Sequence, residues 1–259
     1  MKIAVLGGGN MGGAIAAGVV TAGLAAGQDV CVTHARAALL ERLEKQHCTV
    51  RLLSDNREAV CGADYVFVAV KPWLAEGVLR EIAPELDMER QAVASVVAGL
   101  SFARMKEYLG ASPALFRVIP NTAVSIGQST TFISADGASP AQQEEMMAVF
   151  GALGEAFLVP EEQMTAVTAL CSCGIAYILR YIGASVEGAA KMGLDPSQAL
   201  PMVLQTVRGA VGLLQANGTM PQQEIDKVTT PGGITLKGLE AMERGGFSAA
   251  VIDGLLASK

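Results

Sequence analysis

A glycine pattern near the start of the chain is suited to holding a dinucleotide phosphate. Gly7-Gly8-Gly9-Asn10-Met11-Gly12 fits the spacing G-x-G-x-x-G, follows the apolar run at residues 3–6 and opens an Ala-rich stretch. In a strand-loop-helix unit the first glycine allows a tight turn, the second lets the backbone approach a pyrophosphate, and the third permits close helix packing. The helix start adds free N–H groups and a positive dipole end. We therefore predict cofactor contacts from Gly7, Gly9, Asn10, Met11 and Gly12.

The end of the next apolar run indicates which dinucleotide this loop prefers. Domains that prefer NAD place Asp or Glu about 20 residues beyond the glycine pattern, where it binds the ribose 2′-hydroxyl. Here the chain reads Thr33-His34-Ala35-Arg36, and the first acid is Glu41. Arg36, with His34 near it, would attract a 2′-phosphate that a carboxylate would repel. We predict NADP (used as NADPH), with NAD as an alternative; a solvated Arg36 and a surface turn at His34 are the simpler interpretations.

Two further predicted strands end in residues that could contact the same ligand. Ligands of parallel sheets bind at the carboxyl ends of the strands. The run at 65–70 ends in Ala69-Val70-Lys71-Pro72, and the run at 93–97 is followed by Ala98-Gly99. We predict cofactor contacts from Ala69 to Pro72 and from Ala98. Alternatively, Pro72 only begins a helix and Gly99 only ends a strand.

A segment near the C-terminus could bind an anion. Residues 226–239 read Asp-Lys-Val-Thr-Thr-Pro-Gly-Gly-Ile-Thr-Leu-Lys-Gly-Leu. Two hydroxyls, a proline and two glycines before a helix leave a bare backbone concavity whose N–H groups could hold a carboxylate. Thr230, Gly232, Gly233, Ile234 and Thr235 are the candidates. The alternative is an ordinary helix start, with an N-cap at Thr230 or Thr235.

The elements that must position these residues divide the chain in two. The first part alternates β-branched runs with helical patterns, and the second part has only helical patterns. This predicts an α/β fold. Residues 1–159 would form an N-terminal Rossmann-type, doubly wound parallel sheet, and residues 160–259 a C-terminal all-helical dimerisation domain. Strands are predicted at 3–6, 30–33, 65–70, 93–97, 115–119, 130–134 and 157–159. Helices are predicted at 39–46, 74–82, 102–109, 140–153, 161–191, 196–216, 235–244 and 248–257.

Composition excludes several classes of protein. The chain has 259 residues, 51% of them hydrophobic and 17% charged, yet no run of 18 uncharged apolar residues predicts a membrane span. A net charge of −6 argues against nucleic-acid binding. Five scattered cysteines assemble neither a disulfide framework nor a metal site, so we expect a cytoplasmic protein without a metal.

Glycines at 183, 188 and 193 weaken the predicted long helix at 161–191 by about 1 kcal/mol each relative to alanine. Close packing of this helix must compensate for that loss of stability.

Taken together, these motifs resemble those of the pyrroline-5-carboxylate reductase family. The resemblance runs over the whole chain, through the glycine pattern, Ala69 to Pro72, and residues 95–99, 117–122 and 191–194. The most specific part is the Thr-Thr-Pro-Gly-Gly-Ile-Thr segment at 229–235, which follows a helical domain. The family's fold is a Rossmann domain joined to a helical domain that interlocks with a second subunit.

The resemblance implies an activity and roles for particular residues. The activity is reduction of the cyclic imine 1-pyrroline-5-carboxylate to L-proline, the last step of proline biosynthesis, by hydride transfer from nicotinamide C4 to the C=N carbon. Thr235 would be the catalytic residue that hydrogen-bonds the ring nitrogen, while the backbone at 232–235 binds the carboxylate. Glu161 would lie near the substrate and Asn56 near the adenosine ribose. The partners would be this small imino acid and a second copy of the chain, bound through the helical domain.

The chain also departs from the family pattern. Ser-Gly-Ser-Gly-Pro-Ala-Tyr becomes Cys171-Ser172-Cys173-Gly174-Ile175-Ala176-Tyr177, which weakens hydroxyl donors and changes a helix bend. Two alternatives therefore remain. One is an NADP-dependent β-hydroxyacid dehydrogenase, against which we note that the first long helix carries no lysine before Lys191. The other is an NADP-sensing protein without catalytic activity.

Overall fold

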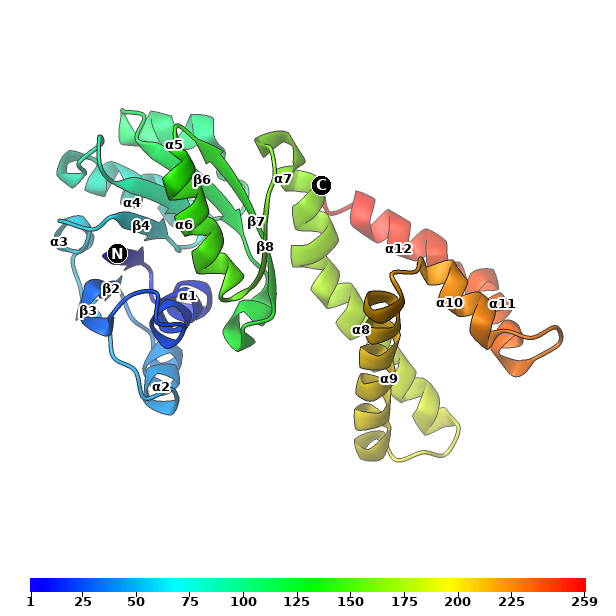
Figure 1. The fold of residues 1–259 in the computed structure, drawn as a ribbon. Helices are drawn as coiled ribbons and strands as arrows, with labels where there is room; N and C mark the ends of the chain where they lie inside the picture. Colours follow the sequence, from blue (N-terminus) through cyan, green and yellow to red (C-terminus); the bar gives the residue numbers. More distant parts are fainter. The chain divides into compact units, whose positions relative to one another are not determined.

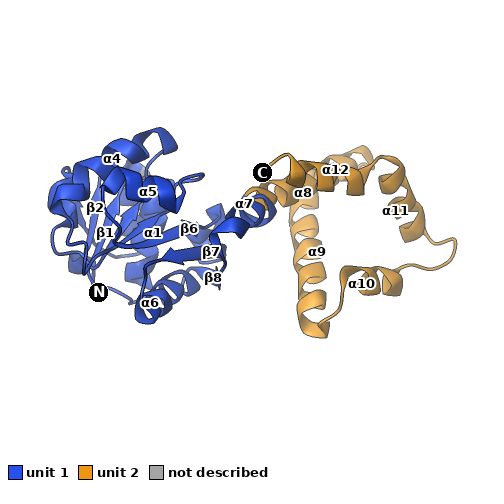
Figure 2. Ribbon diagram, turned by 90° about the horizontal axis from the view of Figure 1, so that it is seen from above, with its two compact units in different colours: residues 1–172 blue, residues 173–259 orange. Residues whose placement is uncertain are grey.

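The chain folds into two compact units, Met1–Ser172 and Cys173–Lys259 (Figure 2). The computed structural model describes residues 1–259, apart from the side chain of Ala38. The first unit contains one eight-stranded sheet in the order β3-β2-β1-β4-β5-β6-β7-β8. Its strands are β1 (Ile3–Leu6), β2 (Val30–Thr33), β3 (Arg51–Leu53), β4 (Tyr65–Val68), β5 (Ala92–Ser95), β6 (Ala114–Ile119), β7 (Ser129–Asp136) and β8 (Gly154–Leu158).

Helices cover both faces of this sheet, which confirms the doubly wound α/β fold (Figure 1). Residues alternate between the faces along each strand: Ile3 and Val5 of β1 pack in one apolar cluster, while Ala4 and Leu6 pack in another. The first cluster includes α1 (Asn10–Thr21), α2 (Ala37–Lys45) and α6 (Pro140–Gly151). The second includes α3 (Asn56–Val60), α4 (Ala75–Ile82) and α5 (Phe102–Leu109).

The direction of the last two strands differs from a purely parallel sheet. Strands β1 to β6 run parallel, but β7 is antiparallel to β6, and β8 is parallel to β7. The connection from β6 to β7 contains only the short 3₁₀ helix η4 (Thr122–Ile126), whereas a parallel pair needs a longer crossover. Helix α6 provides such a crossover between β7 and β8.

The second unit is helical throughout. It contains α8 (Gly174–Lys191), α9 (Pro196–Asn217), α10 (Pro221–Val228), α11 (Ile234–Arg244) and α12 (Phe247–Leu256). Helices α8 and α12 are tied together where Tyr177 hydrogen-bonds Gly254 O at 3.2 Å and the Ser258 hydroxyl at 2.5 Å.

The compact units divide at Ser172, beyond the predicted domain boundary at 159/160. The residues between these two points begin with the 3₁₀ helix η5 (Glu161–Gln163), continue through α7 (Met164–Val167) and end in a π-helical segment, Thr168–Cys173. They belong to the sheet unit because Met164 is buried against Ile119 and Phe132. The compact units therefore divide 13 residues after the predicted boundary, while a boundary between functional domains at 159/160 stays a prediction.

One helical stretch, Glu161–Lys191, is long and apolar enough to cross a membrane as judged by length and composition alone. Little of its most apolar part is buried within the chain. A Cβ added at Gly183 or Gly188 would meet nothing within 4 Å. The close packing expected around these glycines is therefore not supplied by the chain itself.

Candidate functional site

The glycine loop between β1 and α1 has the shape of a phosphate cradle. A Cβ at Gly7, whose φ is +107°, would lie 2.7 Å from the Ala69 carbonyl oxygen, and one at Gly12 would lie 2.2 Å from the Gly7 oxygen. A Cβ at Gly9 would meet nothing within 4 Å. Two of the glycines are thus required by packing, while the space in front of the third is open for a ligand. The residues present therefore fit a dinucleotide.

The start of α1 leaves its backbone donors available. The N-cap is Gly9, which has no side chain that could accept from the first N–H groups, and the first turn contains no acidic residue. Asn10 is exposed and Met11 is half-buried at this helix start. The first N–H groups of a helix have no partner within it, so an anion can accept from them.

The chain after β2 lies directly against this loop. Gly8 N donates to Thr33 O at 2.8 Å, and Arg36 N donates to Gly8 O at 3.1 Å. His34 makes the turn with a positive φ of 49°, a conformation in which His is enriched among residues other than glycine. The side chains of His34 and Arg36 are exposed. Arg36 is also the N-cap of α2, which has no side-chain cap and no acid in its first turn. An arginine and a free helix start therefore lie together beside the loop.

Asn56 lies underneath the loop rather than in front of it. Its side chain is 5% exposed, and the Oδ1 atom accepts from the Thr33 hydroxyl at 2.7 Å. Its Nδ2 atom donates to Glu81 Oε2 at 3.0 Å. Both sides of the amide are engaged inside the protein. A direct contact between Asn56 and a ribose stays a prediction. Sequence reasoning missed Thr33 and Glu81, although a threonine in an otherwise apolar strand was a usable signal.

The other predicted cofactor residues follow β4 and β5 at the same edge. Ala69 N donates to Leu6 O at 2.9 Å, which fixes its carbonyl beneath Gly7. Val70 is half-buried, and Lys71 and Ala98 are exposed. Pro72 starts the 3₁₀ helix η2 (Pro72–Leu74), which agrees with the simpler interpretation and leaves the functional one open. Trp73 follows it and is 77% exposed.

Glu161 is held by the sheet unit. Its Oε1 atom accepts from Phe102 N at 2.9 Å and from Arg117 Nη1 at 2.8 Å. The Arg117 side chain is 12% exposed, so this is a largely buried ion pair. The carboxylate also borders a hollow of about 490 Å³ beside Pro160 and Glu162.

The predicted anion-binding segment forms the loop between α10 and α11 in the helical unit. Gly233 N donates to Thr230 O at 2.9 Å, and Gly232 has a φ of +73°. Gly233 is the N-cap of α11, and no side chain caps the helix. An N-cap at Thr230 or Thr235 is therefore wrong. Ile234 and Thr235 are exposed at the first turn, and among the described residues nothing hydrogen-bonds the Thr235 hydroxyl. The loop thus offers a free hydroxyl and unpaired backbone donors side by side.

No cluster of metal-ligating side chains occurs among the residues that the structure describes. The cysteines are free thiols, and burial raises the pKa of Cys171 in the altered segment. A raised pKa makes that thiol a weaker nucleophile at neutral pH.

Two segments of the chain match known protein families. Residues 161–259 match the pyrroline-5-carboxylate reductase dimerisation family, and residues 2–99 match the family described as NADP oxidoreductase, coenzyme F420-dependent. The chain is 33% identical to pyrroline-5-carboxylate reductase of Synechocystis sp., over 100% of this chain and 96% of that one. It is 34% identical to pyrroline-5-carboxylate reductase 1 of Dictyostelium discoideum, over 99% of this chain and 48% of that longer protein.

A solved structure agrees with these relatives. The crystal structure of Plasmodium falciparum pyrroline carboxylate reductase with NADP bound superposes with a TM-score of 0.91 at 26% identity, covering 100% of this chain and 95% of that one. From the glycine cradle to its last helix, this chain belongs to the pyrroline-5-carboxylate reductase family.

Proposed function

We propose that this protein reduces 1-pyrroline-5-carboxylate to L-proline with NADPH. The observation that carries the proposal is that one chain combines the glycine cradle of the sheet unit with a start of α11 that no side chain caps and where Thr235 is exposed. Neither feature alone specifies the reaction, but the family in which both occur does. The bound NADPH would supply the hydride that the C=N carbon accepts.

The sheet unit would hold the cofactor. The backbone N–H groups of Asn10, Met11 and Gly12, in the first turn of α1, would bind the pyrophosphate in the open space at Gly9. Arg36 and the free start of α2, with His34 adjacent, would bind the 2′-phosphate, which favours NADPH over NADH. Residues 69–72 and Ala98 would form the rest of the edge toward the nicotinamide.

The helical unit would bind the imino acid. A carboxylate needs donors, and the backbone from Gly232 to Thr235 provides them at the uncapped start of α11. Thr230 closes the loop through its carbonyl, and Ile234 exposes an apolar surface that suits the ring methylenes. The free hydroxyl of Thr235 would hydrogen-bond the ring nitrogen as it takes up negative charge from the reaction.

The roles of Glu161 and Asn56 follow from their partners. Glu161 already accepts from Arg117 and from Phe102 N, so we expect it to shape the edge of the substrate site rather than to bind substrate alone. Asn56 is engaged by Thr33 and Glu81, so we expect it to support the cofactor loop from behind.

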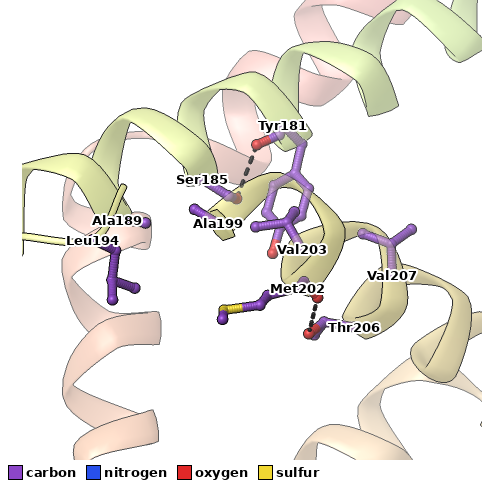
Figure 3. A pocket seen from close by; sticks show the side chains of 9 residues that line it. All are labelled: Tyr181, Ser185, Ala189, Leu194, Ala199, Met202, Val203, Thr206 and Val207. Carbon is purple, nitrogen blue, oxygen red and sulfur yellow. Dashed lines mark hydrogen bonds between the residues drawn. The ribbon is translucent and has the colours of Figure 1, made fainter. Parts of the chain in front are cut away.

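We also propose that two copies of the chain pair through the helical unit. Its helices expose many large apolar side chains, and an apolar hollow of about 170 Å³ opens between α8 and α9 (Figure 3). Tyr181, Met202 and Val203 line it, and the hydroxyls of Ser185 and Thr206 there bond to carbonyls of their own helices. Apolar exposure of this kind is typical of obligate interfaces. A partner would also supply the packing absent around Gly183 and Gly188. The cytoplasmic location and the absence of a membrane partner remain predictions.

One assay distinguishes the candidate activities. NADPH oxidation is measured with 1-pyrroline-5-carboxylate and, in parallel, NADP reduction with a 3-hydroxy acid. We expect substrate-dependent oxidation of NADPH in the first reaction and none in the second. Turnover of the hydroxy acid alone would support the dehydrogenase alternative, and NADPH binding without turnover of either compound would support the sensing protein.

The interface is tested by light scattering after size-exclusion chromatography. Met202, on the hollow, is 57% exposed, and Leu52, on the sheet edge, is 46% exposed. Met202→Glu would place a charge in the apolar face and should convert dimers into monomers at micromolar concentration. Leu52→Glu adds the same charge in the other unit and should leave the oligomer intact. Equal behaviour of the two variants would contradict the proposed interface.

A further inference from the structure

A line of hydrogen bonds runs from the glycine loop into the body of the sheet unit. Gly7 N donates to Thr33 Oγ1 at 3.2 Å, Thr33 Oγ1 donates to Asn56 Oδ1 at 2.7 Å, and Asn56 Nδ2 donates to Glu81 Oε2 at 3.0 Å. The four groups come from the β1–α1 loop, β2, α3 and α4. Glu81, the last of them, lies far along the chain from the loop that the line supports.

The carboxylate at the end of the line fixes the direction of every bond in it. An ionised Glu81 can only accept, so Asn56 must turn its NH₂ group toward Glu81 and its oxygen toward Thr33. The Thr33 hydroxyl must then donate to Asn56, and its lone pairs face Gly7 N. Reversing the Asn56 amide would leave the Thr33 proton without its acceptor and turn the Asn56 oxygen toward the Glu81 carboxylate, so that two acceptors would face each other.

Burial makes this direction consequential. Thr33 is fully buried and Asn56 nearly so, so water cannot replace a bond that is lost. The Gly7 backbone lies close to Ala69, since a Cβ built there would come within 2.7 Å of Ala69 O, and its φ of +107° is one that glycine adopts readily. The conformation of the loop therefore depends on a side chain that does not reach the cofactor edge itself.

We infer that Glu81 is a positioning residue for NADPH binding, acting through Asn56 and Thr33 on the Gly7 amide. This inference rests on the proposed function, since it assumes that the glycine loop binds NADPH. A purely structural role for Glu81, in joining α3 to α4, would lower stability but leave the affinity of the folded protein for NADPH unchanged. The two roles therefore differ in a measurable quantity.

The test uses the full-length protein and a double-mutant cycle. Glu81→Leu removes the acceptor, and Thr33→Val removes the hydroxyl with little change of shape. We expect each variant to bind NADPH about 3- to 10-fold more weakly, the range for one hydrogen bond. The KM for NADPH should rise in parallel with kcat unchanged. The double variant should be no weaker than Thr33→Val alone, because both changes break the same line.

Two control variants test whether the loss of affinity comes from this line of hydrogen bonds and not from other changes nearby. Thr33→Ser keeps the hydroxyl and should retain wild-type affinity. Glu76→Leu removes a carboxylate from the same helix, where it pairs only with the exposed Arg80, and should also bind normally. Dissociation constants come from NADPH fluorescence titration of the folded fraction.

Two results would overturn the inference: wild-type affinity in Glu81→Leu, or losses in the two single variants that add in the double variant. If Glu81→Leu does not fold, wild-type affinity in Thr33→Val overturns it equally. Wild-type protein that binds NADPH without reducing pyrroline carboxylate would refute the proposed reaction and still allow the line to be judged. Wild-type protein that does not bind NADPH would overturn both.

Discussion

Arg117 of β6 donates to Glu161 across 2.8 Å, in a pair whose arginine is almost enclosed by the sheet unit. Removing one partner of such a pair leaves the other charge without compensation. Glu161→Ala should therefore lower the free energy of unfolding by about 1–3 kcal/mol, since Phe102 N loses its acceptor too. Chemical denaturation measures this change. Glu162→Ala, at the exposed neighbouring position, is the control, and a raised KM for the imino acid with full stability would instead indicate that Glu161 acts mainly on substrate.

The charge beside the glycine loop should determine cofactor preference. Arg36→Asp places a carboxylate where the 2′-phosphate is expected, so the ratio of kcat/KM for NADPH to that for NADH should fall by about 10-fold or more, equivalent to at least 1.4 kcal/mol. Lys45→Asp makes the same charge change at the other end of α2 and should leave the ratio unaltered. A ratio that does not respond to Arg36→Asp would show that the phosphate is bound elsewhere.

The free hydroxyl at the start of α11 should matter for turnover and not for the cofactor. Thr235→Ala should lower kcat by about 10- to 1000-fold, the range for one donor that stabilises a transition state. The dissociation constant for NADPH should hardly change, because Thr235 lies in the substrate loop. Thr235→Ser restores the hydroxyl and should recover most of the rate. Wild-type turnover in the alanine variant would remove Thr235 from the proposed role.

Acid should weaken the turn that leads into α10. Lys227, Thr219 and Asn217 all donate to Glu224 Oε1, and the Lys227 bond contributes most to holding the pKa of Glu224 at about 2 instead of 4.5. A lowered pKa in the folded state stabilises the fold above the ordinary value of 4.5, and this contribution is lost as the pH falls toward 2. Thermal unfolding should therefore show an advantage of wild type over Glu224→Gln that shrinks across this window. Glu240→Gln, on the exposed side of α11, should show no such trend.

Local patterns were sufficient to predict most of the fold. The strand-loop-helix start, the strands of the sheet and the long helices all have clear periodicity, and the structure contains them. Strand β3 and helix α3 escaped prediction because each is only one turn or a few residues long, and α10 because its sequence is mostly polar. Strand direction escaped as well, since nothing in the residues of β7 marks it as antiparallel.

The part of the site that depends on backbone conformation was predictable from the sequence. The part that depends on contacts between side chains distant in the sequence was not. Glycines in the cradle are required by close approach, and that requirement is visible in their spacing. Thr33, Asn56 and Glu81 lie more than 20 residues apart from one another, so only the folded chain shows that they bond in series. Likewise, Glu161 gave no sequence signal of its pairing with Arg117.

Trp73 lies beside the predicted cofactor residues that follow β4. It is the single tryptophan of the chain and lies 77% exposed just after Lys71 and Pro72. Indole emission overlaps the absorption of reduced nicotinamide, so excitation of this one residue should produce sensitised light from a dinucleotide held at the same edge. Trp73 would thus serve as an intrinsic energy-transfer donor, and binding of the reduced dinucleotide could be followed in real time without attaching a dye.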